Sequence, residues 1–137
     1  MLTPLRRIIS LQPSVTVTLR ELGKLDVLVA CTKYCADICP EVKARGVTIV
    51  ADSWTAQAEQ IRAAHPDFVI ASVPYQEKSL VEVLKAGVPF LALAPKRLAD
   101  IYADIAIIAR LVDAEEQGER VIQCMRNEIE AMREKTG

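Results

Sequence analysis

The stretch Val27-Leu28-Val29-Ala30-Cys31 decides the fold class, because it is an unbroken apolar run rich in strand-forming residues. Such a run is typical of a β-strand that is covered on both faces, as strands in parallel sheets are. Upstream of it, residues 7–11 form another apolar strand, and residues 14–22 form a helix that ends at Gly23. A strand, a helix and a second strand in this order predict a parallel pair joined by a right-handed crossover.

The same alternation of strands and helices continues along the chain. Further strands are predicted at residues 47–50, 68–72 and 90–94, and further helices at residues 54–64, 77–85, 98–111 and 114–135. Residues 32–46 are predicted to be a long loop, and Ser14 is predicted to cap the first helix. The pattern predicts an α/β fold, with a parallel five-stranded, Rossmann-like sheet, helices on both faces and a long final helix.

Length and composition limit the classes of function. The chain has 137 residues, 51% of them hydrophobic, and a formal net charge of -1 at pH 7, which suits one domain with a single core. Its basic residues are scattered, so no nucleic-acid surface is expected. No apolar run reaches the ~18–20 residues that cross a bilayer. Residues 1–7 lack the features of an export signal, so the chain as written is expected to be cytoplasmic, and a piece of an exported protein is expected to be periplasmic or on the extracellular face.

Aromatic residues gather where ligands bind in a sheet of this type, beyond the carboxyl ends of the strands. Tyr34, Trp54 and Tyr75 each lie just after a predicted strand, and the turn Pro13-Ser14 follows the first strand. Flat rings with polar atoms suit a bulky, partly hydrophobic ligand. We therefore predict that these five residues bind the ligand. The competing interpretation is that the rings only pack loops against the sheet.

The sequence offers no catalytic residues. No glycine-rich phosphate-binding motif follows a strand. The one histidine, His65, precedes a proline at a predicted helix end, where it is expected to cap the helix rather than act as a base. No serine or cysteine can be combined with it into a nucleophilic triad. The chain is therefore not predicted to be an enzyme.

The four cysteines are assigned no metal. Cys31, Cys35 and Cys39 follow a C-x3-C-x3-C spacing, which lacks the usual C-x2-C hairpin and a nearby histidine. Cys31 ends an apolar strand and is expected to be buried. Cys35 and Cys39 lie in the predicted loop and could pair if the protein is exported. Cys124 is expected to be an ordinary helix residue.

Several segments, taken in order, resemble one family. The opening Arg7-Ile8-Ile9-Ser10-Leu11-Gln12-Pro13-Ser14-Val15-Thr16 is similar to the start of the cobalamin and iron-siderophore substrate-binding proteins of ABC importers. The segment Thr32-Lys33-Tyr34-Cys35-Ala36-Asp37 resembles a loop of the vitamin B12-binding branch. Ser53-Trp54 and then His65-Pro66-Asp67-Phe68-Val69-Ile70 resemble the region in which that branch places a corrin-contacting tryptophan. The resemblance covers residues 6–134.

In that family two α/β lobes are joined by a long helix, and the ligand lies between the lobes. The resemblance implies that residues 1–113 are the first lobe and that residues 114–137 begin the connector helix. It implies that Tyr34 and Trp54 face the corrin ring and that Glu59 docks onto an ABC permease. The implied ligand is a cobalamin-like corrinoid, carried as cargo rather than held as an intrinsic cofactor. Haem and ferric siderophores remain open, because an edge of aromatic rings suits all three.

The chain departs from the family because the sequence shows neither an export signal nor a second lobe. The alternative function is therefore a cytosolic corrinoid-binding protein, or a non-transport α/β domain that acts as an interaction or regulatory module.

The final helix also carries an apolar stripe, formed by Val121, Met125, Ile129 and Met132. Exposed stripes of this kind mark interfaces, so we expect a second copy of the chain to cover it in a two-fold homodimer.

Overall fold

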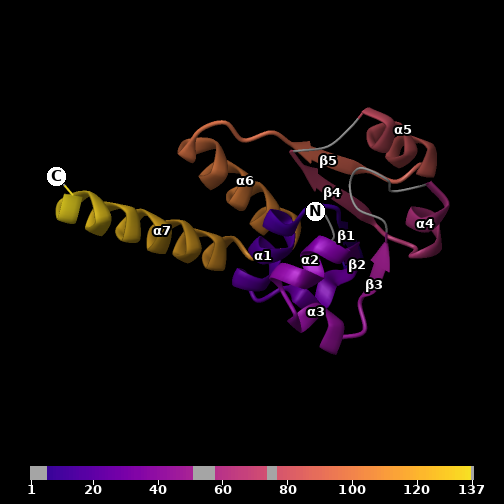
Figure 1. Ribbon diagram of the computed structural model, residues 1–137, viewed down its shortest axis with the longest axis horizontal. Helices are drawn as coiled ribbons and strands as arrows, with labels where there is room; N and C mark the ends of the chain where they lie inside the picture. Colours follow the sequence, from indigo (N-terminus) through magenta and orange to yellow (C-terminus); the bar gives the residue numbers. More distant parts are fainter. Residues whose placement is uncertain (1–5, 51–57, 74–76, 137) are drawn as a thin grey trace.

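The computed structural model describes residues 6–50, 58–73 and 77–136. Within these residues the strands form one sheet of five parallel strands, in the order β3-β2-β1-β4-β5 (Figure 1). The strands are β1 (Ile8–Ser10), β2 (Leu28–Thr32), β3 (Thr48–Val50), β4 (Phe68–Ser72) and β5 (Phe90–Leu93). The predicted α/β class and parallel five-stranded sheet are confirmed.

The strand order contains one reversal, and it lies at the centre of the sheet. β1 pairs with β2 on one side and with β4 on the other. From β1 the chain moves outward through β2 to β3, and then crosses back to β4 and β5. The direction therefore reverses between β1 and β4. Doubly wound sheets open their ligand crevice at such a point.

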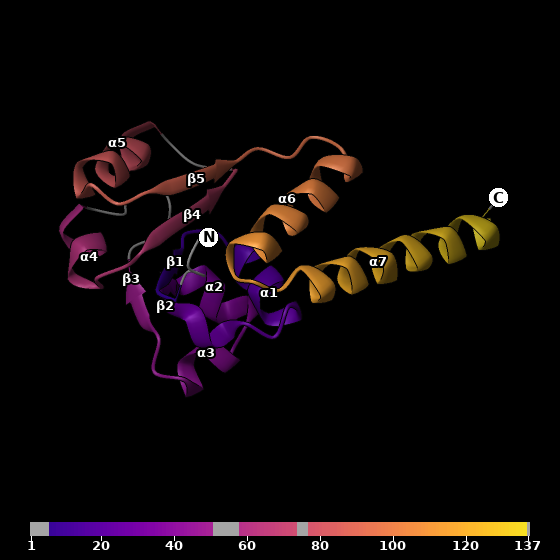
Figure 2. The ribbon, with the colours of Figure 1, turned by 180° about the vertical axis from the view of Figure 1, so that it is seen from behind.

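Helices cover both faces of the sheet, as predicted. The helices of the described residues are α1 (Pro13–Glu21), α2 (Lys33–Ile38), α3 (Glu41–Ala44), α4 (Ala58–Ala63), α5 (Glu77–Ala86), α6 (Leu98–Leu111) and α7 (Glu115–Thr136), with a 3-10 turn, η1 (Leu25–Val27), before β2. Helices α4 and α5 pack together on one face, whereas α1, α2, α3 and α6 lie on the other (Figures 1 and 2).

Each face of the sheet has its own core. The larger core includes Ile8, Ile70, Leu19 of α1 and Ile108 of α6. The smaller core includes Ile9, Val69, Ile61 of α4 and Val83 of α5. Consecutive residues of a strand point to opposite faces, so Ile8 and Ile9 belong to different cores although they are neighbours in sequence. This two-sided burial is the reason that the central strands are continuously apolar.

The prediction of a long loop at residues 32–46 is wrong, because two short helices, α2 and α3, occupy most of this segment. The side chain of Thr32 caps α2 by accepting a hydrogen bond of 3.2 Å from the backbone N–H of Cys35. Threonine at this position satisfies an N–H group that has no partner inside the helix. The helix is therefore started by a local cap rather than by an apolar pattern, which a search for periodicity does not detect.

The start of α1 also differs from the prediction. Ser14 does not cap this helix; Gln12 is the N-cap residue, and it makes no side-chain cap hydrogen bond. Pro13 occupies the first turn, where a proline costs nothing because its missing N–H would have no partner. Helix α6, in contrast, has the predicted bounds of residues 98 and 111.

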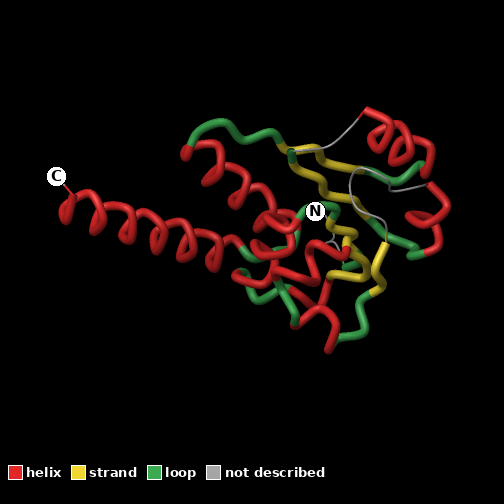
Figure 3. Tube along the Cα trace, in the orientation of Figure 1, coloured by secondary structure: helices red, strands yellow, loops and turns green. Residues whose placement is uncertain are grey.

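Helix α7 leaves the body of the domain after crossing α6, and Figure 3 shows its far end projecting from the rest of the chain. The crossing point is at Gly118, which is buried. A Cβ atom at position 118 would lie 2.6 Å from the Cβ of Ala109. Glycine is required here because the two helices approach too closely for any side chain.

Candidate ligand-binding edge of the sheet

The loops that follow β1, β2, β4 and β5 meet along one border of the sheet, here called the carboxyl edge. At its centre, the loops after β1 and β4 are tied together across the reversal in strand order. The side-chain amide of Gln12 donates a hydrogen bond of 3.0 Å to the carbonyl oxygen of Val73. The backbone N–H of Leu11 donates another, of 2.9 Å, to the carbonyl oxygen of Ile70. These bonds hold the two loops in a fixed relation at the point where a ligand crevice is expected.

Buried hydroxyl groups form hydrogen bonds that hold the start of the turn that contains Pro13 and Ser14. Thr16 Oγ1 donates a 2.8 Å hydrogen bond to Ser10 Oγ, and Ser10 Oγ donates a 2.9 Å bond to the carbonyl oxygen of Gln12. Both hydroxyl-bearing side chains are fully buried. Pro13 is half-buried and Ser14 is exposed, so the turn presents its outer surface at the carboxyl edge.

Tyr34 lies in the first turn of α2, directly after β2, and its side chain is 49% exposed. The Lys33 ammonium lies 5.4 Å from the centroid of the Tyr34 ring, within the range of a cation–π interaction. The ring is thus an accessible flat surface beside a positive charge. Pro13, Ser14 and Tyr34 follow adjacent parallel strands, so the structure brings these three predicted site residues to the same edge.

A cavity of about 420 Å³ opens at the same edge, on the side of α1 that faces α6. The loops after three strands contribute Gln12, Val73 and Pro95, and the first turn of α1 contributes Ser14. The helices also contribute apolar residues that include Val17, Ile105, Ile108 and Met125. Asp104 also lines it, and burial, together with the nearby Asp100, raises the pKa of its carboxyl group. Tyr34 does not line this cavity, because α1 packs between α2 and α6.

The remaining predicted site residues are placed apart or not at all. Trp54 and Tyr75 lie outside the described residues. Glu59 is exposed in the first turn of α4, in the helix layer opposite that of Tyr34. It therefore lies on the face of the sheet opposite to α1 and α2.

The hydrogen bonds around the Cys35 thiol, next to Tyr34 in α2, were not predicted from the sequence. Thr32 Oγ1 donates a hydrogen bond of 3.2 Å to the thiol of Cys35, and Ser10 Oγ lies 3.9 Å from the same sulfur. Hydrogen bonds with Cys31, Thr16 and Thr32 lower the pKa of the Cys35 thiol to about 5, against the effect of burial. The position of Thr32, between an apolar strand and Cys35, is the sequence signal that could have revealed this network.

The cysteines stand as free thiols, and Cys31 is fully buried, as expected. Cys35 and Cys39, which could pair if the protein is exported, are both free here. Cys39 instead turns its thiol to the Glu41 carboxylate, over 3.5 Å. No group of three or more metal-ligating side chains is found within residues 6–50, 58–73 and 77–136.

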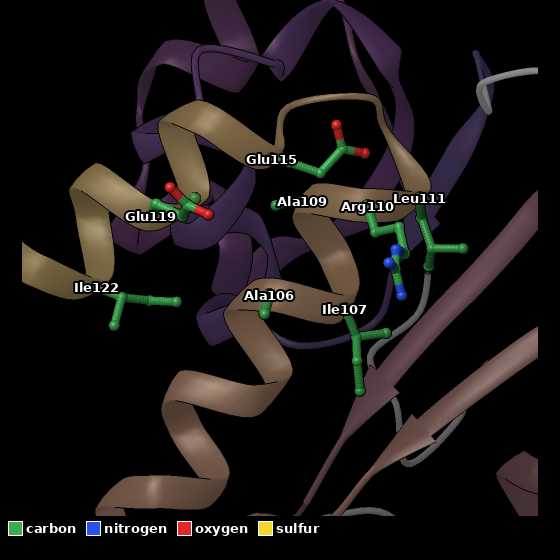
Figure 4. A pocket seen from close by; sticks show the side chains of 9 residues that line it. Ala106, Ile107, Ala109, Arg110, Leu111, Glu115, Glu119 and Ile122 are labelled. Atoms are coloured by element: carbon green, nitrogen blue, oxygen red, sulfur yellow. The ribbon is translucent and has the colours of Figure 1, made fainter.

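A second cavity, of about 540 Å³, lies away from the strand ends, in the angle between α6 and α7 (Figure 4). It is lined by Ala106, Ile107, Ala109, Arg110, Leu111, Glu115, Gly118, Glu119 and Ile122. All of these residues come from the two helices or the turn between them. The cavity is therefore a product of the helix crossing, and we do not assign the ligand to it.

His65 ends α4 with a backbone conformation of φ 50°, and its N–H bonds to the carbonyl oxygen of Arg62. This confirms its expected place at the helix end.

The part of the chain that the structure describes has no helix with the length and apolar character of a membrane span.

Comparisons with known proteins agree on the fold. The profile of the periplasmic binding protein family matches residues 8–137. The periplasmic vitamin B12 binding protein of Vibrio cholerae superposes with a TM-score of 0.81 at 26% identity, over 96% of this chain and 51% of that chain. A periplasmic heme-binding protein from Pseudomonas aeruginosa gives a TM-score of 0.84 at 18% identity, over 95% of this chain and 46% of that chain.

The petrobactin-binding protein of Bacillus subtilis has a TM-score of 0.83 at 18% identity, over 94% of this chain and 46% of that chain. The chain thus spans about half the length of these solved structures. None of the curated proteins matches it significantly in sequence.

Proposed function

Because this chain belongs to the periplasmic binding protein family, we propose that it is the first lobe of the substrate-binding component of an ABC importer and that its ligand is a corrinoid such as cobalamin. In this proposal, residues 1–113 are the lobe and residues 114–137 are the start of the helix that connects it to a second lobe. The chain acts as a binding protein rather than an enzyme, and transport is the role of the whole protein of which this lobe is half.

The observation that carries the proposal is the exposed ring of Tyr34 on the carboxyl edge, beside the rigid turn at Pro13 and Ser14. An accessible aromatic ring offers apolar contact with a polar atom at its end, which suits a large planar ligand. We propose that Trp54 and Tyr75 complete this surface, because they follow β3 and β4 in sequence. The similarity to the vitamin B12 binding protein of Vibrio cholerae, at 26% identity, supports a corrinoid as the ligand.

The proposed partner of the whole protein is an ABC permease, which Glu59 contacts. Glu59 is exposed and lies in the first turn of α4, where a negative charge is favoured by the helix dipole. A charge that is fixed in this way on the surface can attract arginine side chains of a partner. Replacement of Glu59 by lysine should therefore weaken permease binding without changing affinity for the ligand, since the side chain lies in the layer opposite Tyr34.

A cobalamin titration, followed by absorbance and by tryptophan fluorescence, tests the proposal. Trp54 is the only tryptophan, so quenching of its emission reports binding at the proposed site. Trp54→Ala should weaken cobalamin binding by ~1–3 kcal/mol and leave folding nearly unchanged. Affinity should be low for the lobe alone, because one lobe buries only about half of the surface that a closed cleft would bury.

A matched control is Tyr102→Ala, which removes an aromatic ring of α6 that contacts Arg126 and lines neither cavity. It should leave cobalamin affinity unchanged.

Parallel titrations with hemin and with a ferric siderophore distinguish the ligand classes. The corrinoid assignment is wrong if either binds more tightly than cobalamin. If Trp54→Ala unfolds the chain and does not change binding in a two-lobed protein, Trp54 is structural and the proposed site is wrong.

A further inference from the structure

The cavity of about 420 Å³ between α1 and α6 combines apolar walls with a few polar groups. Val17 of α1, Ile108 of α6 and Met125 of α7 are among the side chains that form its walls. Sites for small molecules have this composition, because apolar walls bind the body of a ligand and a few polar groups fix its orientation. Tyr34 does not line the cavity, since α1 packs between α2 and α6. A ligand here therefore contacts α1 on the side opposite to Tyr34.

Ser72, the last residue of β4, is the most deeply buried polar residue of the cavity lining, with 4% of its surface exposed. It follows Ile70 by two positions along the strand, so both side chains face the sheet surface that α1 and α6 cover. Within residues 6–50, 58–73 and 77–136, the Ser72 hydroxyl forms no hydrogen bond. Buried hydroxyl groups normally have a partner. This one is therefore available to a ligand in the cavity.

Asp104 provides an unpaired charge in the same cavity. It is half-buried on α6, and among the described residues its carboxylate has no hydrogen bond and no ion pair. Burial, and then the nearby Asp100, raise the pKa of this carboxyl group. Glu21, the other acidic residue in the lining, is paired with Arg20 over 3.0 Å. A cation beside Asp104 would stabilise its ionised form, because an opposite charge offsets the cost of partial burial.

No basic side chain of the described residues provides this cation, since no lysine, arginine or histidine of that part of the chain lines the cavity. Arg126 follows Met125 on α7, but its guanidinium group lies over the ring of Tyr102, 4.9 Å from the centroid. A ligand with a negative charge would place that charge beside Asp104 without compensation. A neutral ligand would leave the carboxylate unpaired. A ligand with a positive charge complements the cavity.

We propose that this cavity binds a small apolar amine in its ammonium form. The Asp104 carboxylate and the Ser72 hydroxyl are the polar partners of the ammonium group, which has three N–H donors. The apolar body of the amine lies against Val17, Ile108 and Met125. This inference goes beyond the proposed corrinoid site and does not depend on it, because the residues that define the amine site lie on β4, α6 and α7 rather than on α2.

The test compares hexylammonium, 1-hexanol and hexanoate, which carry the same apolar chain and differ in charge. Each is titrated into the chain with isotopically labelled methionine methyl groups, and binding is followed by NMR. The Met125 signal reports occupancy, because Met125 lines the cavity. Met132 is 65% exposed on the same helix and does not line the cavity, so its signal reports any change in self-association through α7. Hexylammonium should shift Met125 but not Met132, with an affinity at least about fivefold higher than that of 1-hexanol. Hexanoate should give no saturable shift.

Two variants identify the polar partners. Asp104→Asn should lower the affinity for hexylammonium to that for 1-hexanol. Ser72→Ala should weaken hexylammonium binding by about threefold to tenfold without a loss of folding stability, because the hydroxyl that it removes has no partner among the described residues. Glu119→Gln is the matched control, since it removes an exposed carboxylate from the other cavity, between α6 and α7, and should change nothing.

The comparison of the three probes decides the question in the unmodified chain and does not rely on the folding of any variant. A saturable Met125 shift with hexylammonium as the tightest probe supports the proposal. The proposal is overturned if Met125 shows no saturable shift, or if 1-hexanol or hexanoate binds as tightly as hexylammonium. An unchanged hexylammonium affinity in Asp104→Asn or in Ser72→Ala also overturns it, as does a loss of affinity in Glu119→Gln.

Discussion

The Cα of Gly118 faces the methyl group of Ala109 so closely that an added Cβ would lie 2.6 Å from it. This contact fixes the distance between α6 and α7 at their crossing. The larger core also reaches the turn between the two helices here, since Ala109, Val112 and Ala114 are members of that core, and Val121 of α7 packs against it. The crossing is therefore both a packing contact and the base from which α7 extends.

Replacement of Gly118 by alanine should destabilise the domain by ~1–3 kcal/mol, because the new methyl group has no room between the helices. Urea unfolding measures the change. Ala109→Gly, combined with Gly118→Ala, should recover part of the loss, and this recovery identifies the contact through a double-mutant cycle. Gln117→Ala, at the exposed neighbouring position, is the control and should have little effect. A Gly118→Ala protein of normal stability would show that the helices move apart freely.

Gln12→Ala should loosen the carboxyl edge, because it removes the side-chain hydrogen bond to the Val73 carbonyl oxygen. The expected loss of stability is ~0.5–1 kcal/mol, since the bond is partly exposed to water. Hydrogen exchange should increase for the amides after β4. Gln60→Ala removes an exposed glutamine from α4 and should change neither quantity. Unchanged exchange after β4 in Gln12→Ala would show that other contacts hold this loop.

The stability contributed by Asp100 should depend on pH. Backbone N–H groups of Lys96 and Arg97 donate to its carboxylate over 3.0 Å each and lower its pKa. A carboxyl group whose pKa is lower in the folded than in the unfolded state stabilises the fold above the unfolded value. This contribution is lost as the pH falls through the folded value.

Thermal unfolding of Asp100→Asn should therefore show a loss of stability at neutral pH that shrinks as the pH falls below ~3.9, the ordinary pKa of an unfolded aspartate. Asp37→Asn, at an exposed position of α2, is the matched control for the loss of a surface carboxylate. If the stability difference for Asp100→Asn stays constant over this range of pH, the hydrogen bonds from Lys96 and Arg97 to the carboxylate do not stabilise the fold.

The apolar stripe of α7 predicts self-association. Val121 packs against the larger core and Met125 lines the cavity beside α1, whereas Ile129 is half-buried and Met132 is 65% exposed. We expect light scattering to show a two-fold dimer at high concentration. Ile129→Glu should convert it to a monomer, and Glu130→Gln, on the exposed side, should not. A strict monomer at all concentrations would contradict the prediction.

The fold could be predicted because its strands are buried on both faces. Continuous apolar runs such as the one in β2 reveal such strands without any knowledge of their neighbours. The two short helices after β2 could not be predicted in this way. They depend on the Thr32 hydroxyl and on the packing of Cys35, Cys39 and Val42, which are contacts rather than sequence periods.

The candidate site was predictable in part. The rule that ligands bind beyond strand ends placed Pro13, Ser14 and Tyr34 at one edge, and the structure confirms that they share it. The bond between Gln12 and Val73 could not be foreseen, because it requires knowing that β1 lies beside β4. The predicted roles of Trp54 and Tyr75 stay predictions.

The crossing at Gly118 also makes α7 a lever. From Gly118 to Thr136 the helix extends for roughly 27 Å at ~1.5 Å per residue. A rotation of about 10° at the crossing would swing the far end through roughly 5 Å. A change as small as one methyl group, made where two helices touch, would therefore be magnified into a displacement larger than the side chain that caused it. The direction in which α7 points is set by the smallest residue on it.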